Sequence, residues 1–266
     1  QSEQDQRQRK QGVPPDANTG KYKLHVLSAF ATELGISLGQ LCTQEKENEI
    51  VVIPELLDML CIKDCIITID ALGCQRTIAE KVIKGEGDYI FIVKDNQPKL
   101  KEIVLSVTES IVSKGTTVRF DKYETHEEGH GRNESRICYC CNDPGFLGAD
   151  IRKKWKNIQS FGYIENTRNT NKGTTVEKRC FISSLEPDAQ KILKNSREHW
   201  EIENNLHWQL DVNFHEDNTR SRNISALNFS VLAKIALATL RNNKREIPIY
   251  RKRLIAGWDI EFLWER

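Results

Sequence analysis

The chain has 266 residues, of which 38% are hydrophobic and 29% are charged, and its 39 basic and 38 acidic residues leave a net charge of +1. This length suits an α/β domain with an insertion. The charge balance excludes a chain that is basic throughout but does not exclude a local basic surface. We find no apolar run long enough to span a bilayer and no signal peptide, so we expect no membrane segment.

The N-terminal part begins with about twenty polar residues, a composition typical of a loop or of disorder. Two strands are predicted next, over 23–31 and 36–44, with a hairpin turn between them. A helix over 53–60 follows, with Pro54 near its first helical position.

The middle of this region alternates strands and helices. Four β-favouring residues, Ile66–Ile69, predict a buried strand that ends at Asp70. A helix over 74–84, a strand over 88–93 and a helix over 97–112 come next. Alternation of this kind predicts an α/β core.

The pattern changes near residue 115, where turn residues and charges separate short strand-like patches and no long helix intervenes. We interpret this region as a β-rich insertion, and helical periodicity returns after Pro187, over 188–212 and 225–244. The expected segments are a disordered or loop terminus (1–21), the first part of the core (22–114), the β-rich insertion (115–186), a helical part of the core (187–246) and a C-terminal tail (247–266).

The eight cysteines do not have the spacing of a small disulfide scaffold. Cys138, Cys140 and Cys141 form the densest group, but a zinc site usually draws its ligands from two close pairs, and no second pair with His follows. We therefore favour reduced cytosolic thiols over a zinc site.

Asp70 stands at the carboxyl end of a predicted strand, where open α/β sheets place their reactive groups. An Asp in front of a helix also caps orphan N–H groups. From position alone, both interpretations stay open.

A second group of polar residues lies on the predicted helix over 188–212. His199, Glu203 and His207 are spaced by four and share one helical face, with Asp211 next along it. Such a row can hold a transition metal, but from the residues alone a solvated polar face is favoured.

Seven segments, in this order and spacing, resemble the DDE transposases of the ISAs-one type, also called H-repeat-associated, which are related to the IS-four transposases. The resemblance covers about residues 22 to 262. The segments are "LHVLSAFATELGISLGQ", "PELLDML", "ITIDALGCQRTIAEKVI", "GDYIFIVKDNQPKL", "GHGRNESR", "RCFISSL" and "SREHWEIENNLHWQLDVNFHED".

This resemblance implies an RNase H-like mixed sheet with flanking helices, interrupted by the β-rich insertion. Three carboxylates of such a core hold two Mg²⁺ (or Mn²⁺) ions, and Asp70 and Glu203 match the second Asp and the Glu. The implied reaction is metal-dependent DNA cleavage and strand transfer of an insertion sequence, in which water frees a 3′-hydroxyl that then attacks target DNA.

The resemblance also implies binding to transposon ends and target DNA, a homo-oligomer when active, and a bacterial cytoplasmic protein that joins the nucleoid when bound to DNA. Asn96 has a competing interpretation as a helix N-cap, and the motif at 130–132 belongs to DNA binding or to structure. Positions that hold Tyr, Arg and Lys in the wider IS-four pattern hold Ser196, His199 and Leu210 here. The candidate DNA contacts are Lys94, Asn96, Gln97, His130, Arg132, Arg197, His199 and His207.

No good candidate for the first catalytic Asp is present. Asp5 has no apolar strand before it, and Asp16 follows two prolines, which central strands do not tolerate. The sequence begins with Gln, which suggests a fragment or a processed product. Because the resemblance places the first Asp on a core strand before "LHVLSAF", we expect a chain that lacks this strand with its Asp. The alternatives are a catalytically dead remnant that acts as a DNA-binding or assembly module and, third, a host nuclease on the same core.

Overall fold

The computed structural model describes residues 25–43, 49–114, 120–129, 132–171, 173–216 and 224–265. The chain divides into two compact units, of which one is Ile53–Asn204 and the other combines Gln1–Val52 with Asn205–Arg266. The boundaries fall inside helix α2 (Glu49–Asp58) and inside a π-helical segment (Ile202–His207). Within the described ranges, none of the helices has both the length and the apolar character needed to cross a bilayer.

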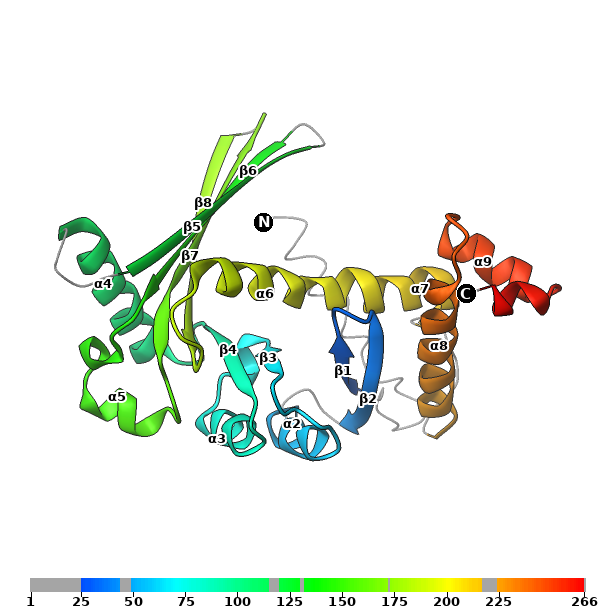
Figure 1. Ribbon diagram of the computed structural model, residues 1–266, viewed down its shortest axis with the longest axis horizontal. Helices are drawn as coiled ribbons and strands as arrows, with labels where there is room; N and C mark the ends of the chain where they lie inside the picture. Colours follow the sequence, from blue (N-terminus) through cyan, green and yellow to red (C-terminus); the bar gives the residue numbers. More distant parts are fainter. Residues whose placement is uncertain are drawn as a thin grey trace, which may run out of the picture. The chain divides into compact units, whose positions relative to one another are not determined.

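The unit Ile53–Asn204 is built on a six-stranded mixed sheet with the strand order β3-β4-β8-β7-β6-β5 (Figure 1). Strands β3 and β4 are parallel, and all other neighbours are antiparallel. The strands are β3 (Ile66–Ile69), β4 (Asp88–Val93), β5 (Phe120–Gly129), β6 (Arg132–Cys141), β7 (Ser160–Thr170) and β8 (Gly173–Ser183). The predicted mixed α/β class is therefore confirmed.

Helices cover both faces of this sheet. Helix α3 (Arg76–Lys84) connects the two parallel strands, and α4 (Pro98–Lys114) packs on β6, β7 and β8. Helix α6 (Ala189–Glu201) lies on the other face, because Cys138 and Cys140 of β6 pack against it while the alternate residue Cys141 reaches Thr108 of α4. A short turn, η3 (Pro144–Leu147), and helix α5 (Ala149–Lys154) join β6 to β7.

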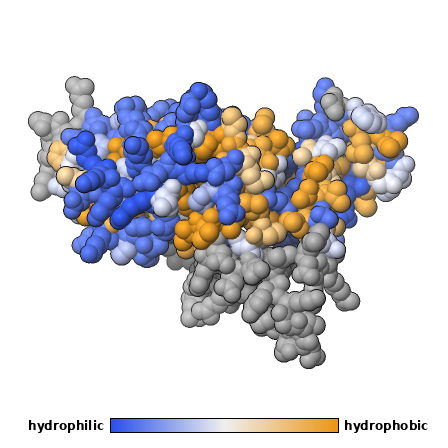
Figure 2. Space-filling view, turned by 90° about the horizontal axis from the view of Figure 1, so that it is seen from below, coloured by the Kyte–Doolittle hydropathy of each residue, from blue (hydrophilic) through white to orange (hydrophobic). Residues whose placement is uncertain are grey.

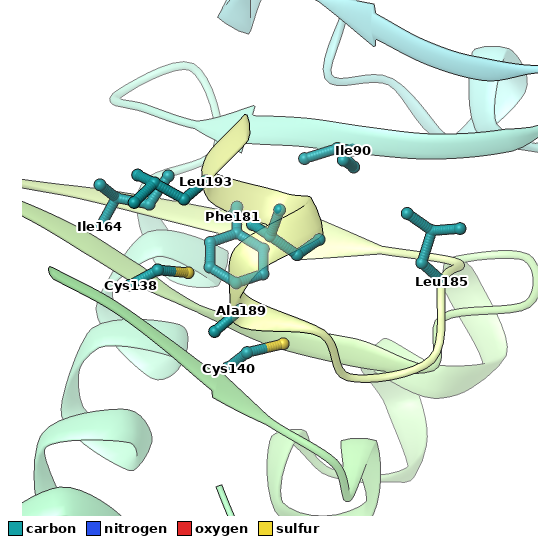
Figure 3. Packing of buried hydrophobic residues seen from close by; sticks show 9 residues of the cluster. Ile90, Cys138, Cys140, Ile164, Phe181, Leu185, Ala189 and Leu193 are labelled. Atoms are coloured by element: carbon teal, nitrogen blue, oxygen red, sulfur yellow. The ribbon is translucent and has the colours of Figure 1, made fainter. Parts of the chain in front are cut away.

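The core between the sheet and α6 is apolar and contains two of the thiols (Figure 3). Burial raises the pKa of Cys140 to about 12, so this thiol stays protonated and packs as a small apolar group. The sheet contributes Ile90, Cys138, Cys140, Ile164 and Phe181, and Leu185, Ala189, Ile192 and Leu193 complete the cluster.

Three sequence-based expectations need correction. The β-rich region is not a separate module, because β8 pairs with β4 and continues the sheet of β3 (Ile90 opposite Ser183). Period-two patterning shows which face of a strand is buried but not which strand lies beside it. Strand β3 is half-buried rather than buried, since within the described residues only one of its edges is paired. Helix α2 begins at Glu49, whose charge suits a helix start, so Pro54 lies inside it.

The second unit contains the predicted hairpin of β1 (His25–Ala31) and β2 (Ile36–Thr43), whose turn uses Gly35 at φ +66°. Helix α8 (Ile224–Asn242) packs on β2, and its buried Lys234 donates hydrogen bonds to Ser28 and Gln40. The remaining elements are α7 (Trp208–Phe214), α9 (Ile249–Ala256) and η6 (Glu261–Trp264).

Large apolar side chains of this second unit also reach solvent, among them Leu232, Ile235, Trp258 and Trp264. Figure 2 shows hydrophobic residues interspersed with hydrophilic ones at the molecular surface.

Gly162 of β7 offers a test of the sheet packing. A Cβ atom there would lie 1.9 Å from the carbonyl oxygen of Tyr139 in the neighbouring strand. We predict that Gly162→Ala lowers the free energy of unfolding by about 1–3 kcal/mol, the usual cost of overpacking. Urea denaturation measures this, and Gly129→Ala is the control, since a Cβ at Gly129 meets nothing within 4 Å. Equal effects of the two substitutions would contradict the packing described here.

Candidate active site

Asp70 follows the last residue of β3 and caps the turn after it, while its side chain stays largely exposed. Its Oδ1 accepts a hydrogen bond of 2.6 Å from the Ala71 N–H and so caps a 3₁₀ turn, η2 (Ala71–Gly73). The side chain is 70% exposed. Within the described residues, Oδ2 has no hydrogen bond or ion pair, so one oxygen positions the carboxylate while the other faces solvent.

Lys94 follows β4 as Asp70 follows β3. Because the two strands are parallel neighbours, their carboxyl ends lie side by side, and the Lys94 Nζ is 3.6 Å from the Asp70 Oδ1. A lysine ammonium therefore faces the candidate catalytic carboxylate across the end of the sheet.

The loop that carries Lys94 is fixed to the turn after Asp70 by two side-chain amides. Asn96 Nδ2 donates to the Ala71 carbonyl at 2.6 Å, and Gln97 Nε2 donates to the Cys74 carbonyl at 3.2 Å. The competing interpretation of Asn96 as a cap of α4 is not what the structure has. Both side-chain amides donate to backbone carbonyl oxygens and so connect the ends of β3 and β4.

Helix α6 leads into the π-helical segment that carries the second carboxylate, Glu203. Its first turn is held by two aspartates, since Asp121 of β5 accepts from the Ala189 N–H at 2.7 Å and Asp188 accepts from the Lys191 N–H at 2.8 Å. The sheet-facing stripe of Ala189, Ile192 and Leu193 continues at helical spacing to His199 and Glu203.

His199 links α6 to β3. Its Nδ1 lies 3.3 Å from the hydroxyl of Thr68, which is two residues before Asp70 and so on the same side of the strand. Burial lowers the pKa of His199, Asp70 opposes this shift and Lys94 adds to it. The ring is therefore neutral at neutral pH and can donate from one nitrogen only. Thr68 was not singled out by sequence, although the period-two spacing from Asp70 was a usable signal.

Glu203 lies within the electrostatic reach of Asp70. Burial raises the pKa of Glu203, the charge of Asp70 raises it further, and Lys94 lowers it. Glu203 makes no hydrogen bond or ion pair with another residue in the part of the chain that the structure describes. The two carboxylates thus repel each other and share only one nearby ammonium.

The backbone at Glu203 is π-helical over Ile202–His207, which sequence reasoning missed. π-helical turns close i→i+5 hydrogen bonds and often occur at functional sites. The expectation that His199, Glu203 and His207 share one face assumed an α-helical period, which the backbone does not keep from Ile202 to His207. The charges of Asp70 and Lys94 act on both His199 and Glu203. His207 belongs to the other compact unit.

Of the remaining predicted contacts, Arg197 has its ion-pair partner on another strand of the sheet. Arg197 forms an ion pair with Glu127 of β5, whose pKa is lowered by hydrogen bonds from Arg136 and Arg197. His130 lies outside the described residues. Arg132 begins β6, and its side chain is outside the described part.

The donor chemistry suits a hard divalent cation. Asp70 and Glu203 offer carboxylate oxygens, the ligands that Mg²⁺ prefers, and their mutual repulsion is what a bound cation would relieve. Among the described residues no group of three or more His, Cys, Asp or Glu side chains is arranged to hold a metal ion. Asp70 and Glu203 are two carboxylates whose charges act on each other, and as such they could offer oxygen ligands to one cation.

The candidate site thus combines a carboxylate at a strand end with a Glu that follows a helix packed on the same sheet. The family model "Transposase DDE domain" matches residues 2–240, and the chain belongs to this family.

Two relatives are proteins of Escherichia coli K12, YbfL and the "H repeat-associated putative transposase YhhI", each 39% identical over 255 residues. Each alignment covers 93% of this chain and 66% of the relative, so the chain spans about two thirds of their length. A solved structure, the piggyBac transposase in its synaptic complex with hairpin DNA, shares 10% identity and a TM-score of 0.48, over 96% of this chain and 50% of that one.

The opposite pKa shifts of two glutamates predict opposite effects on stability. The native state holds the proton of Glu203 more tightly than the unfolded chain does, so stability falls as pH rises from the ordinary value of 4.5 through the raised native pKa. Glu203→Gln should therefore be more stable than the wild type near neutral pH, and this gain should vanish below pH 4.5.

Glu127 supplies the matched control for this prediction. Its lowered pKa gives stability that is present above 4.5 and is lost as pH falls through the native value. Glu127→Gln should cost up to about 1 kcal/mol at neutral pH. Urea denaturation at pH 7 and pH 4 measures both, and an equal loss from the two substitutions at pH 7 would contradict the assignment.

Proposed function

We propose that this chain supplies two metal-binding carboxylates, Asp70 and Glu203, to a DDE transposase that cleaves DNA and transfers the cut strand. The observation that carries this proposal is that His199, four residues before Glu203, lies 3.3 Å from the hydroxyl of Thr68, two residues before Asp70, although the whole β5–β8 region separates the two segments in sequence. The charge of Asp70 accordingly acts on Glu203. The family of the chain and the strand-end position of Asp70 support it.

The chemistry requires oxygen ligands and nearby positive charge. A divalent cation held by Asp70 and Glu203 supplies stabilisation of the attacking and leaving oxygens of an in-line displacement at phosphorus. Thr68 orients His199, whose neutral ring can donate to a phosphate oxygen. Lys94 supplies positive charge to the same phosphodiester. None of these roles needs a covalent protein intermediate.

The third carboxylate belongs, in this proposal, to a strand of an RNase H-like core. Such a strand would pair with the edge of β3 that has no partner within the described residues. The parallel β3–β4 pair would then continue beside the strand as part of the same sheet. A carboxylate at the end of the added strand would lie next to Asp70.

A second candidate function is a DNA-binding or assembly module without cleavage activity. It is favoured by the structural use of Asp70, whose Oδ1 caps the turn η2 and needs no metal to do so. In both cases DNA, as transposon ends and target, is the proposed partner, a homo-oligomer is the proposed active form, and the bacterial cytoplasm is the proposed location.

Iron-mediated cleavage tests the metal site without requiring DNA cleavage. Fe²⁺ that replaces Mg²⁺ reduces added hydrogen peroxide to hydroxide and a hydroxyl radical, ascorbate returns the Fe³⁺ formed to Fe²⁺, and the radicals cut the backbone beside the ion. We predict fragments that end near Asp70 and near Glu203, competed by Mg²⁺. Asp70→Asn and Glu203→Gln should each abolish both cuts, because one carboxylate alone binds weakly.

Asp95→Asn is the matched control, because Asp95 is an exposed carboxylate on the neighbouring loop that pairs with Lys101 at 2.8 Å. Its fragments should match those of the wild type. Cuts near Asp70 that survive Glu203→Gln would place the two carboxylates in different sites and contradict the proposal.

DNA binding should be separable from the metal site. Phosphate contacts dominate non-specific affinity, so binding measured by gel shift should weaken steeply with salt and survive Asp70→Asn. Metal-dependent nicking of supercoiled DNA separates the two candidate functions. The chain is assayed together with a segment that can pair with β3 and that carries an Asp. Nicking under these conditions supports the transposase, and DNA binding without nicking supports the module. Failure of wild type and variant to bind at low salt would contradict both.

A further inference from the structure

Lys94 is the cation nearest to the two candidate metal ligands among the described residues. Its Nζ lies 3.6 Å from the Asp70 Oδ1, and its charge acts on Glu203 and His199 as well. The same ammonium also influences Glu177, which is paired with Arg179 through two bonds of 2.9 Å. The Lys94 ammonium therefore acts on both candidate metal ligands.

The backbone position of Lys94 is fixed, but its side chain is loosely held. Asn96 and Gln97 attach the loop to the turn after Asp70. At 3.6 Å the contact with Asp70 is longer than a hydrogen bond, and the Lys94 side chain is 50% exposed. The structural ion pair of the same loop, Lys101 with Asp95, is closer, at 2.8 Å.

The other acidic groups near Lys94 are paired with other cations, so Lys94 interacts mainly with Asp70 and Glu203. Asp95 is adjacent in sequence, yet it is hydrogen-bonded to Lys101, which lowers the pKa of Asp95. Glu177 is held by Arg179. Asp70 and Glu203 are therefore the acidic groups near Lys94 that have no stronger cationic partner within the described residues.

We propose that Lys94 is an internal counter-ion, which neutralises Asp70 and Glu203 before a divalent cation binds and then moves to a DNA phosphate. This inference rests on the proposed function, because it takes Asp70 and Glu203 as metal ligands. A lysine suits the exchange, since its ammonium is a point charge on a flexible stem and an exposed pair costs little to break.

Two consequences follow from this exchange. Lys94 competes with the divalent ion, so its removal should strengthen metal binding, whereas loss of a purely structural residue would weaken it. Metal binding frees Lys94 for phosphate, so metal and DNA should each increase the affinity for the other, and this coupling should depend on Lys94.

The first consequence is tested by titrating the full chain with Mn²⁺ and measuring water-proton relaxation. Lys94→Met should bind Mn²⁺ about two- to five-fold more tightly than the wild type, the size expected from removing an exposed ion pair. Lys99→Met is the control, because Lys99 is an exposed lysine at the start of α4 and its loss changes the net charge equally. Equal or weaker binding by Lys94→Met, or the same gain in Lys99→Met, would overturn the inference.

The second consequence is tested by DNA affinity in EDTA and in Ca²⁺. The penalty of Lys94→Met relative to Lys99→Met should be absent in EDTA and about two- to five-fold in Ca²⁺. An equal penalty in both conditions would make Lys94 a permanent DNA contact and overturn the exchange.

The wild-type titration separates the two proposals. Mn²⁺ binding that Asp70→Asn abolishes, without tightening in Lys94→Met, overturns the inference and leaves the proposed function standing. Mn²⁺ binding that is insensitive to Asp70→Asn and Glu203→Gln, or that is absent from every variant, overturns both.

Discussion

The packing of helix α6 on the six-stranded sheet is the constraint on which the candidate site depends. Asp121 and Asp188 fix the first turn of α6, and its apolar stripe buries Ile192 and Leu193 against Phe181 of the sheet. Further along, Arg197 pairs with Glu127 of β5, and the Arg179 guanidinium of β8 lies 4.8 Å from the ring centre of Trp200. These contacts set the rotation of the helix about its axis. His199 therefore meets Thr68 of β3, and Glu203 comes within the electrostatic reach of Asp70 although the two carboxylates form no direct hydrogen bond.

The same arrangement explains why the site opposes stability while the surrounding sheet supplies it. Charged groups around Glu127 are paired and hydrogen-bonded, which lowers the pKa of that carboxyl. Glu203 has a raised pKa and a like-charged neighbour, as expected of groups arranged to bind a ligand rather than to hold the fold. The apolar core under α6 offsets the cost of keeping such groups close, and active sites commonly depend on stability supplied elsewhere in this way.

Sequence patterns predicted most of the elements but few of their partners. Strand β4 was predicted at both of its ends, because apolar residues between turn signals mark a strand clearly. The pairing of β8 with β4 was not predictable, since period-two alternation carries no information on the neighbouring strand. Asp70 was found from its place after a strand and Glu203 from the family resemblance. The hydrogen bond from the Asn96 side-chain amide to the turn after Asp70 could not be predicted, because it depends on two parallel strand ends that meet in space. The π-helical turns at Glu203 depend on tertiary packing.

The buried thiols can report how often helix α6 separates from the sheet. Cys138 and Cys140 are fully buried beneath α6, whereas Cys61 and Cys65 are exposed, with Cys65 immediately before β3. An alkylating reagent attacks the thiolate, and burial raises the pKa of Cys140 to about 12. Exposed thiols therefore react at once, while those of the core react only as α6 lifts from the sheet. The ratio of the two labelling rates measures the free energy of the opening that separates α6 from the sheet. This measurement uses the native cysteines and needs no introduced label site.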